Sequence, residues 1–246
     1  MKDYRPESFG EYMADEYDSS VKNPSQTETE QTVDVLADLA SGGTILELAI
    51  GTGRVALPLA ARGLSVTGIE ASSRMVEKLR AKPGGDGIDV TLGDMADVGV
   101  DGTFNLIYLV FNTLFNLTSQ VDQVRCFRNV SKHLSDEGLF VIEAYVPDPR
   151  QYENGESLKT VHVAIDRTIL EASVHNAALQ TVDYQYIEIT DHGMKLHPLP
   201  VRYVWPSELD LMAQLAGLEL YQRWAGWDRS PFTASSPSHV SIYRVS

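Results

Sequence analysis

The stretch from Ile45 to Arg54, with the sequence ILELAIGTGR, has the residue types and spacing of a nucleotide-binding loop. An apolar run ends in a glycine-containing turn, and the apolar pattern from Val55 onward predicts a helix. Gly51 and Gly53 allow the backbone to turn sharply and to approach a ligand where a Cβ atom would clash. The stretch therefore predicts a strand, a tight loop and a helix start whose backbone N–H groups hold a nucleotide-like ligand.

An acidic residue further along the chain supports the same chemistry. The apolar run at 64–69 ends in Glu70, seventeen residues after Gly53. A carboxylate at this distance from the loop is placed to accept hydrogen bonds from the two hydroxyls of a ribose. The two features together predict an α/β domain that binds a cofactor.

Alternating apolar and helical patterns surround these motifs. The pattern predicts strands at 44–48, 64–69, 88–92, 104–109 and 139–144, and helices at 26–40, 54–62, 72–81 and 119–134. A turn at 135–138 is expected between the last helix and the last strand. This alternation is typical of a mostly parallel sheet covered by helices on both faces.

The pattern changes after residue 158. Alternating stretches at 160–165, 168–174, 180–190 and 195–204 predict an antiparallel meander. A helix at 207–216 is expected to begin with a capping box formed by Ser207 and Asp210. Segments 218–224 and 239–245 then predict a closing hairpin. We expect three parts: 1–150 with an N-terminal lid and the cofactor-binding core, an inserted β region at 151–204, and 205–246 completing the core.

With Asp94 and Met95 in a turn after the third strand, the chain resembles the class I S-adenosylmethionine-dependent methyltransferases. The resemblance is close over residues 30–150 and implies a Rossmann-like sheet of seven strands with a C-terminal antiparallel hairpin. The first-strand motif of the family is acid-x-Gly-x-Gly-x-Gly, and here Ala49 stands at the first glycine. We expect this alanine to cost little, provided that its φ is below zero.

The resemblance implies a role for each motif in binding S-adenosylmethionine. Gly51 and Gly53 would lie against the methionine part of the cofactor, and Glu47 would lie near its amino group. Glu70 would hold both ribose hydroxyls, because a carboxylate accepts two hydrogen bonds side by side. The remaining expected contacts are Asp94 with the adenine amino group, Met95 beside the ring, and Ala49 and Val110.

A NAD-dependent dehydrogenase is the nearest alternative of the same fold class. Residues 51–56 fit the fingerprint G-x-G-x-x-A of such proteins. The acid Glu47 within the first strand, the turn at Asp94 and the late hairpin all favour the methyltransferase interpretation over this alternative.

The methyl acceptor is expected beyond the fourth and fifth strands, at the carboxyl edge of the sheet. Phe111 and Tyr145 follow these strands, and Tyr12 and Tyr17 belong to an N-terminal segment that resembles the lid of the same enzymes. Aromatic side chains exclude water and stabilise a methylammonium-like cation. The loop at 110–114 lacks the Asp/Asn-Pro-Pro-aromatic motif of DNA amino-methyltransferases and resembles those of small-molecule methyltransferases, including N-methyltransferases of amino sugars.

The inserted β region is expected to cover the acceptor or to form an interface between subunits. Four aromatic residues of the C-terminal half are candidates for that surface: Tyr203, Trp205, Trp227 and Phe232. Arg202 and Arg229 could bind an acidic group of the acceptor. None of the six histidines has a partner at ligand-like spacing on one helix face, so no metal site is expected and no general base can be named.

Composition limits the possible partners. The 246 residues carry a net charge of −14 with no cluster of basic residues, which disfavours a nucleic-acid substrate. No apolar run is long enough for a membrane helix, the N-terminus lacks the apolar core of a signal peptide, and Cys126 is the only cysteine. These features favour a cytoplasmic protein.

We therefore expect an enzyme that moves a methyl group from S-adenosylmethionine to a small molecule, with nitrogen preferred over oxygen as the acceptor. The alternatives are an O-methyltransferase of a hydroxylated metabolite, a regulatory protein that binds the cofactor without turnover, and methylation of a protein. A homo-oligomer is plausible, because exposed aromatic residues in the β region favour self-association.

Overall fold

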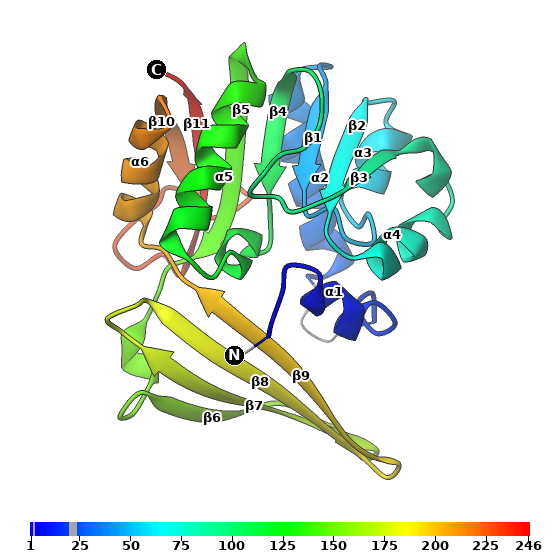
Figure 1. Cartoon of the computed structure of the whole chain (residues 1–246), viewed down its shortest axis with the longest axis vertical. Coiled ribbons are helices and arrows are strands. Elements are labelled where there is room, and N and C mark those ends of the chain that lie inside the picture. Colours follow the sequence, from blue (N-terminus) through cyan, green and yellow to red (C-terminus); the bar gives the residue numbers. More distant parts are fainter. Residues whose placement is uncertain (2, 20–23) are drawn as a thin grey trace.

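The computed structural model describes residues 1, 3–19 and 24–246, and it contains two β-sheets (Figure 1). The larger sheet contains β1 (Ile45–Leu48), β2 (Val66–Glu70), β3 (Asp89–Leu92), β4 (Phe104–Leu109), β5 (Leu134–Tyr145), β10 (Leu218–Trp224) and β11 (Ser238–Val245). The smaller sheet contains β6 (Glu156–Val163), β7 (Arg167–Asn176), β8 (Thr181–Thr190) and β9 (Gly193–Arg202). The helices are α1 (Ser8–Met13), α2 (Gln26–Ala40), α3 (Ala56–Ala61), α4 (Ser73–Arg80), α5 (Gln120–His133) and α6 (Pro206–Leu215).

The larger sheet has the strand order β10-β11-β5-β4-β1-β2-β3. Strands β1 to β5 run parallel to one another, while β10 and β11 form an antiparallel hairpin on β5. One face packs against α2, α3 and α4, and the other against α5 and α6, so the central strands carry apolar side chains on both faces. The predicted fold class is confirmed.

Helix ends agree with the sequence pattern except at α6. Ser25 and Glu28 form a capping box at the start of α2, in which each side chain accepts a hydrogen bond from the backbone N–H of the other. The expected capping box of α6 is wrong, because Trp205 occupies the N-cap without a side-chain hydrogen bond and Pro206 begins the helix. Asp210 instead pairs with Arg223 at 2.6 Å, which ties α6 to β10.

The expected turn before β5 is also absent. The strand begins at Leu134, directly after α5, and residues 135–138 belong to it. Its pairing with β4 shifts register between Phe104 and Leu106, where the extra residues are accommodated. An irregular strand start thus takes the place of a separate loop.

The smaller sheet lies below the carboxyl edge of the larger one, and α1 lies near β9 beneath the same edge (Figure 1). Val182, Val201 and Tyr203 from β8, β9 and the segment after β9 join the same apolar cluster as β4, β5 and α5. Because the two sheets share this cluster, the smaller sheet is anchored to the body at one end. In the described parts of the chain, no helix has the combination of length and apolar character that crossing a membrane requires.

The N-terminal segment 3–19 is docked on α4. Gly10 is buried, and a Cβ atom there would lie 2.3 Å from Cβ of Ser72, so only glycine permits this approach. Ser72 donates a hydrogen bond of 2.7 Å to Glu11. Asp15 pairs with Arg74 and Lys78 at 2.6 and 2.8 Å. Close packing and these bonds place the segment over the ends of the parallel strands.

Candidate active site

Two cavities open side by side at the carboxyl edge of the larger sheet. The smaller has a volume of about 310 Å³ and the larger about 500 Å³. Both fall in the size range of small-molecule sites. Four residues line both cavities and form the boundary between them: Phe9, Tyr17, Thr113 and Asn116. The two cavities therefore adjoin each other at these residues.

The loops after β1, β2 and β3 bring most of the predicted cofactor residues to the smaller cavity. Its walls include Ala49, Gly51, Glu70, Asp94 and Met95. A Cβ atom on Gly51 would have no neighbour closer than 4.0 Å, so the backbone of this loop is open toward a ligand. The segment 4–17 closes the opposite side through Tyr4, Phe9 and Tyr17.

Glu70 is fixed in a position that suits a ribose. Its two carboxylate oxygens accept hydrogen bonds from the backbone N–H groups of Gly51 and Ser72, at 2.8 and 2.9 Å. Burial raises the pKa of Glu70, and these two donors oppose that rise. Because a carboxylate oxygen can accept more than one hydrogen bond, each oxygen can still accept one from a ligand hydroxyl.

The structure adds detail to the positions of Asp94 and Ala49 in the cavity wall. One oxygen of Asp94 accepts a hydrogen bond of 2.9 Å from the N–H of Ala96, and the other lies 3.8 Å from Arg125. Its side chain is therefore positioned by its own turn before any ligand binds. The condition under which Ala49 was expected to cost little is not met: its φ is +55°, in the left-handed region that favours glycine.

Three residues predicted to contact the cofactor lie behind the cavity walls. Glu47 is buried and accepts a hydrogen bond of 2.7 Å from Tyr108, its neighbour across β1 and β4. Burial raises the pKa of Glu47 to about 8. Gly53 faces Leu57 and Leu79, which a Cβ atom would meet at 3.1 Å, and Val110 belongs to the core. These residues do not line either cavity and support the loop from behind.

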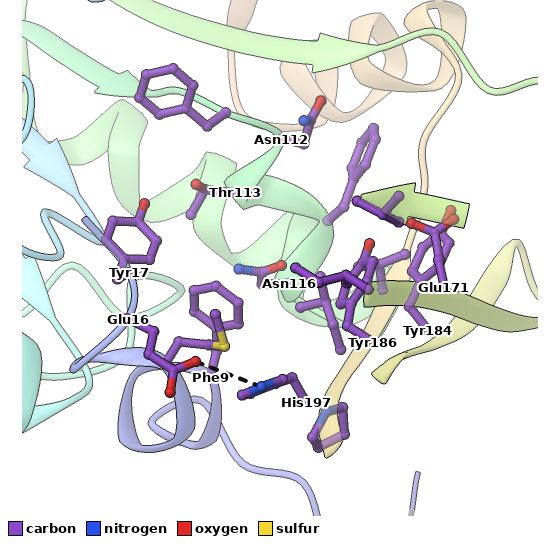
Figure 2. A pocket seen from close by; sticks show the side chains of 18 of the residues that line it. Phe9, Glu16, Tyr17, Asn112, Thr113, Asn116, Glu171, Tyr184, Tyr186 and His197 are labelled. Carbon is purple, nitrogen blue, oxygen red and sulfur yellow. Dashed lines mark ion pairs between the residues drawn. The ribbon is translucent and has the colours of Figure 1, made fainter. Parts of the chain in front are cut away.

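The larger cavity is built from elements far apart in the sequence (Figure 2). Tyr17, Phe111 and Tyr145 line it, as expected for the acceptor side. Tyr12 lies outside both cavities and is 58% exposed. On the six-residue helix α1, Phe9 and Met13 face the cavity one turn apart, which turns Tyr12 toward solvent. The expected role of Tyr12 in the acceptor wall is therefore not supported.

The loop after β4 has an unusual backbone. Phe111 and Asn112 have φ values of +57° and +64°, a conformation that side-chain-bearing residues rarely adopt. Glu143 holds it by accepting a hydrogen bond of 2.9 Å from the N–H of Phe111, and Trp227 donates to the other oxygen of Glu143 at 2.9 Å. Asn112 accepts a hydrogen bond of 2.6 Å from the N–H of Tyr145. Such strain, held by surrounding bonds, is typical of functional loops.

Arg54 is a site residue that sequence reasoning missed. It lines the larger cavity, lies over the ring of Phe111 at 4.1 Å, and donates a hydrogen bond of 2.8 Å to the hydroxyl of Tyr17. Its Nε and Nη1 atoms are buried and have no partner. A buried guanidinium group with free donors suits an anionic group of a ligand. Its position directly after the glycine loop is the signal in the sequence by which it could have been found.

The arginine and aromatic residues that were expected to meet the acceptor from the inserted β region and the C-terminal part do not line either cavity. Arg202 pairs with Glu208 and Arg229 pairs with Asp38, each at 2.8 Å, so neither faces a cavity with free donors. The four aromatic candidates do not line either cavity: Tyr203, Trp205, Trp227 and Phe232. The inner face of the smaller sheet instead presents Tyr184, Tyr186 and His197 to the larger cavity.

Comparison with known proteins agrees with this geometry. A family model described as a methyltransferase domain matches residues 45–138. The solved structure of the CcbJ methyltransferase from Streptomyces caelestis is 36% identical, covers 99% of this chain and 100% of that one, and has a TM-score of 0.91. A curated relative, the cypemycin N-terminal methyltransferase of Streptomyces sp, is 26% identical over 79% of this chain and 80% of its own.

A more distant solved structure shares the fold. The sugar N-methyltransferase KedS8 from Streptoalloteichus sp ATCC 53650 is 18% identical, covers 94% of this chain and 92% of that one, and has a TM-score of 0.67. The fold, the ordered motifs of the smaller cavity and the similarity to CcbJ over the whole chain lead to one assignment. This chain belongs to the class I S-adenosylmethionine-dependent methyltransferases.

Proposed function

We propose that this methyltransferase transfers a methyl group to an amine nitrogen of a small acceptor of natural-product or sugar-like type. The observation that carries the proposal is the shared boundary of the two cavities, at which Phe9, Tyr17, Thr113 and Asn116 face both sides. The smaller cavity has the acid and the open glycine loop that suit S-adenosylmethionine, and the larger has room for the acceptor.

Bound S-adenosylmethionine supplies an electrophilic methyl group on its sulfonium. The chain orients the two reactants and excludes water, which is most of what an in-line displacement requires. Glu70 would hold the ribose through the free acceptor positions of its oxygens. Arg54 would hold the carboxylate of the methionine part with its two unpartnered donors, since it follows the glycine loop directly. Aromatic walls at Tyr17 and Phe111 would keep the reacting atoms dry.

The charges of the larger cavity favour an amine. Three carboxylates line it, from Glu16, Glu171 and Glu188, while Arg54 and Arg167 are its guanidinium groups. With Arg54 assigned to the cofactor, the carboxylates that line the metal-free cavity outnumber its guanidinium groups, which favours a cationic amine. An amine loses its proton to water before it attacks, so the cavity needs no dedicated base. The names of two relatives, an N-terminal and a sugar N-methyltransferase, support this preference.

The expected division of the chain fits this function. We propose that 1–150 and 205–246 form the cofactor-binding body and that 151–204 covers the acceptor, since the inner face of the smaller sheet lines the larger cavity.

The outer face of the smaller sheet exposes Leu158, Val174 and Leu196, and this apolar surface supports a homo-oligomer. Light scattering of the purified protein tests the oligomer, and a strictly monomeric mass would contradict it.

The decisive experiment uses methyl-labelled S-adenosylmethionine and pairs of acceptors that differ only in carrying an amine or a hydroxyl at one carbon. Amino sugars with their parent sugars, and arylamines with their parent phenols, make suitable pairs. We expect label in the amines and none in the matched hydroxyl compounds, with mass spectrometry locating the methyl group on nitrogen. Transfer to the hydroxyl members alone would contradict the nitrogen preference, and transfer only to proteins of a cell lysate would contradict a small acceptor.

A further inference from the structure

We propose that Glu16, Glu188 and His197 form a binding site for a divalent transition-metal ion, Mn²⁺ or Zn²⁺, on the wall of the larger cavity. All three residues line that cavity, and their ligand atoms lie within 4.8 Å of one another. The binding of the ion is independent of the methyl-transfer reaction. The role of the ion in holding the acceptor rests on the proposed function.

The distances within the group suit an ion better than direct hydrogen bonds. Nε2 of His197 lies 3.8 Å from Oε2 of Glu16 and 3.7 Å from Oε2 of Glu188, too far for a hydrogen bond. Ligand atoms at metal bonds of 2.0–2.2 Å stand about 3.3 Å apart in a tetrahedral site, so the two distances to His197 need to close by about half an ångström. The carboxylate oxygens of Glu16 and Glu188, which lie within 4.8 Å of each other, would also draw together around the ion. Figure 2 shows the imidazole of His197 turned toward Glu16.

The outer oxygens of both carboxylates have partners of their own. Lys195 donates to Oε1 of Glu16, and Arg167 lies 3.4 Å from Oε1 of Glu188. The Oε2 atoms that face His197 remain for an ion. Carboxylates that bind metals are commonly hydrogen-bonded through their second oxygen in this way. The side chains of His197 and Glu188 are only 13% and 12% exposed, so these ligands are held within the wall.

The donor set indicates the class of metal. One imidazole nitrogen with two carboxylate oxygens suits Mn²⁺ or Zn²⁺, whereas Mg²⁺ and Ca²⁺ prefer oxygen ligands alone. Three protein ligands leave an open coordination position. Because all three residues line the cavity, an acceptor with an oxygen or nitrogen donor can occupy that position. The class of acceptor thereby narrows to amines that carry a second, metal-binding polar group.

The proposed site also joins two parts of the molecule. Glu16 belongs to the N-terminal segment, while Glu188 and His197 lie on β8 and β9 of the smaller sheet. Their separation in the sequence explains why no motif predicts a metal here. An ion bound by all three would tie the segment over the cofactor to the sheet over the acceptor.

The test is calorimetric titration of MnCl₂ or ZnCl₂ into the full chain after removal of metals with a chelator, with neither cofactor nor acceptor present. We expect one saturable site per chain. His197→Gln and Glu188→Gln each remove a ligand, so their affinity should fall by at least about tenfold. His192→Gln is the matched control, because His192 lies beside Asp191 in the exposed turn between β8 and β9, and it should bind as the parent does.

Absence of saturable binding, or unchanged affinity in both His197→Gln and Glu188→Gln, would overturn the metal site. Two ligand variants are used so that one can decide if the other does not fold, which circular dichroism checks. The titration contains no methyl donor, so its failure leaves the methyl-transfer proposal intact. A saturable metal site in a protein that methylates no amine would contradict the proposed function alone.

Discussion

The two cavities are built in different ways. The smaller one is formed largely by short loops after successive strands, and its fixed polar contacts use backbone N–H groups, as at Gly51 and Ser72. The larger one draws its walls from the N-terminal segment, the loop after β4, the end of β5 and the smaller sheet. A site built from the backbone of short loops is suited to one ligand, and a short sequence motif reveals it. A site of side chains on distant strands can change its ligand by substitution without disturbing the fold.

The largest effect is expected for Glu70→Ala, which tests the smaller cavity through its affinity for the cofactor. The variant would lose two hydrogen bonds that the ribose hydroxyls donate to the carboxylate, each worth about 1.5–3 kcal/mol, so cofactor affinity should fall by at least about a hundredfold. Calorimetry with S-adenosylhomocysteine measures it. Glu77→Ala, an exposed acid of α4, is the control and should bind normally. Unchanged affinity in Glu70→Ala would remove the ribose assignment, and a circular dichroism spectrum checks that the variant folds.

Arg54 lines the larger cavity and donates a hydrogen bond to Tyr17, which lines both cavities, so Arg54→Met tests to which ligand the arginine belongs. Loss of a charged hydrogen bond to the carboxylate of the methionine part should weaken cofactor affinity by about 10- to 100-fold. Decarboxylated S-adenosylmethionine lacks that carboxylate, so the variant should bind it and the intact cofactor almost equally well. Arg62→Met, at the end of α3 and paired with Asp34, is the control. Unchanged preference for the carboxylate in Arg54→Met would place Arg54 on the acceptor side.

The buried acid behind the glycine loop predicts a pH dependence of stability. The pKa of Glu47 is raised by burial from 4.5 to about 8, so between these values the folded chain holds a proton that the unfolded chain has lost. The contribution of Glu47 is therefore fully present below pH 4.5 and is lost as the pH rises toward 8. Glu47→Gln keeps the acceptor for Tyr108 without the ionisation. Its free energy of unfolding should exceed that of the parent by about 1 kcal/mol or more near pH 8, with little difference in acid.

Urea unfolding of both proteins across this pH range makes the measurement. A difference in free energy that does not change with pH would contradict the raised pKa. Glu47 does not line the larger cavity, so Glu47→Gln should leave the walls of that cavity unchanged.

Ala49→Gly gives the smallest effect. The alanine has a φ of +55°, which costs an L-residue about 1–2 kcal/mol, while glycine adds entropy to the unfolded chain. The variant should therefore gain about 0.5–1 kcal/mol in unfolding free energy. Ala60→Gly, inside α3, should lose a similar amount, because glycine destabilises a helix interior. A loss at position 49 as large as that at position 60 would show that the loop does not need the left-handed conformation.

Much of the fold follows from the sequence because local patterns and tertiary packing agree. The alternation of strands and helices from 26 to 144, the meander and the closing hairpin were predictable, as each element carries its own periodicity. The start of β5 and the cap of α6 were not. At Leu134 the pairing with β4 overrides the turn residues, and at Asp210 the pairing with Arg223 takes the carboxylate away from the helix end.

The site divides in the same way. Ala49, Gly51, Glu70, Asp94 and Met95 line the smaller cavity, because a motif fixes which loops end at one sheet edge. Which side of the loop a residue faces is not encoded by the motif, and Glu47, Gly53 and Val110 lie behind it. On the acceptor side only tertiary structure brings His197 and Glu188 opposite Glu16, since nothing in their spacing links residues so far apart.

The shared boundary has a kinetic consequence. Phe9 and Tyr17 belong to one short segment, and each lines both cavities, so any displacement of that segment changes access to both ligands at once. Release of the methylated product and of the demethylated cofactor becomes linked to a single motion. When the opening of that segment is the slow step of turnover, its rate sets the same upper limit on the rate for every acceptor.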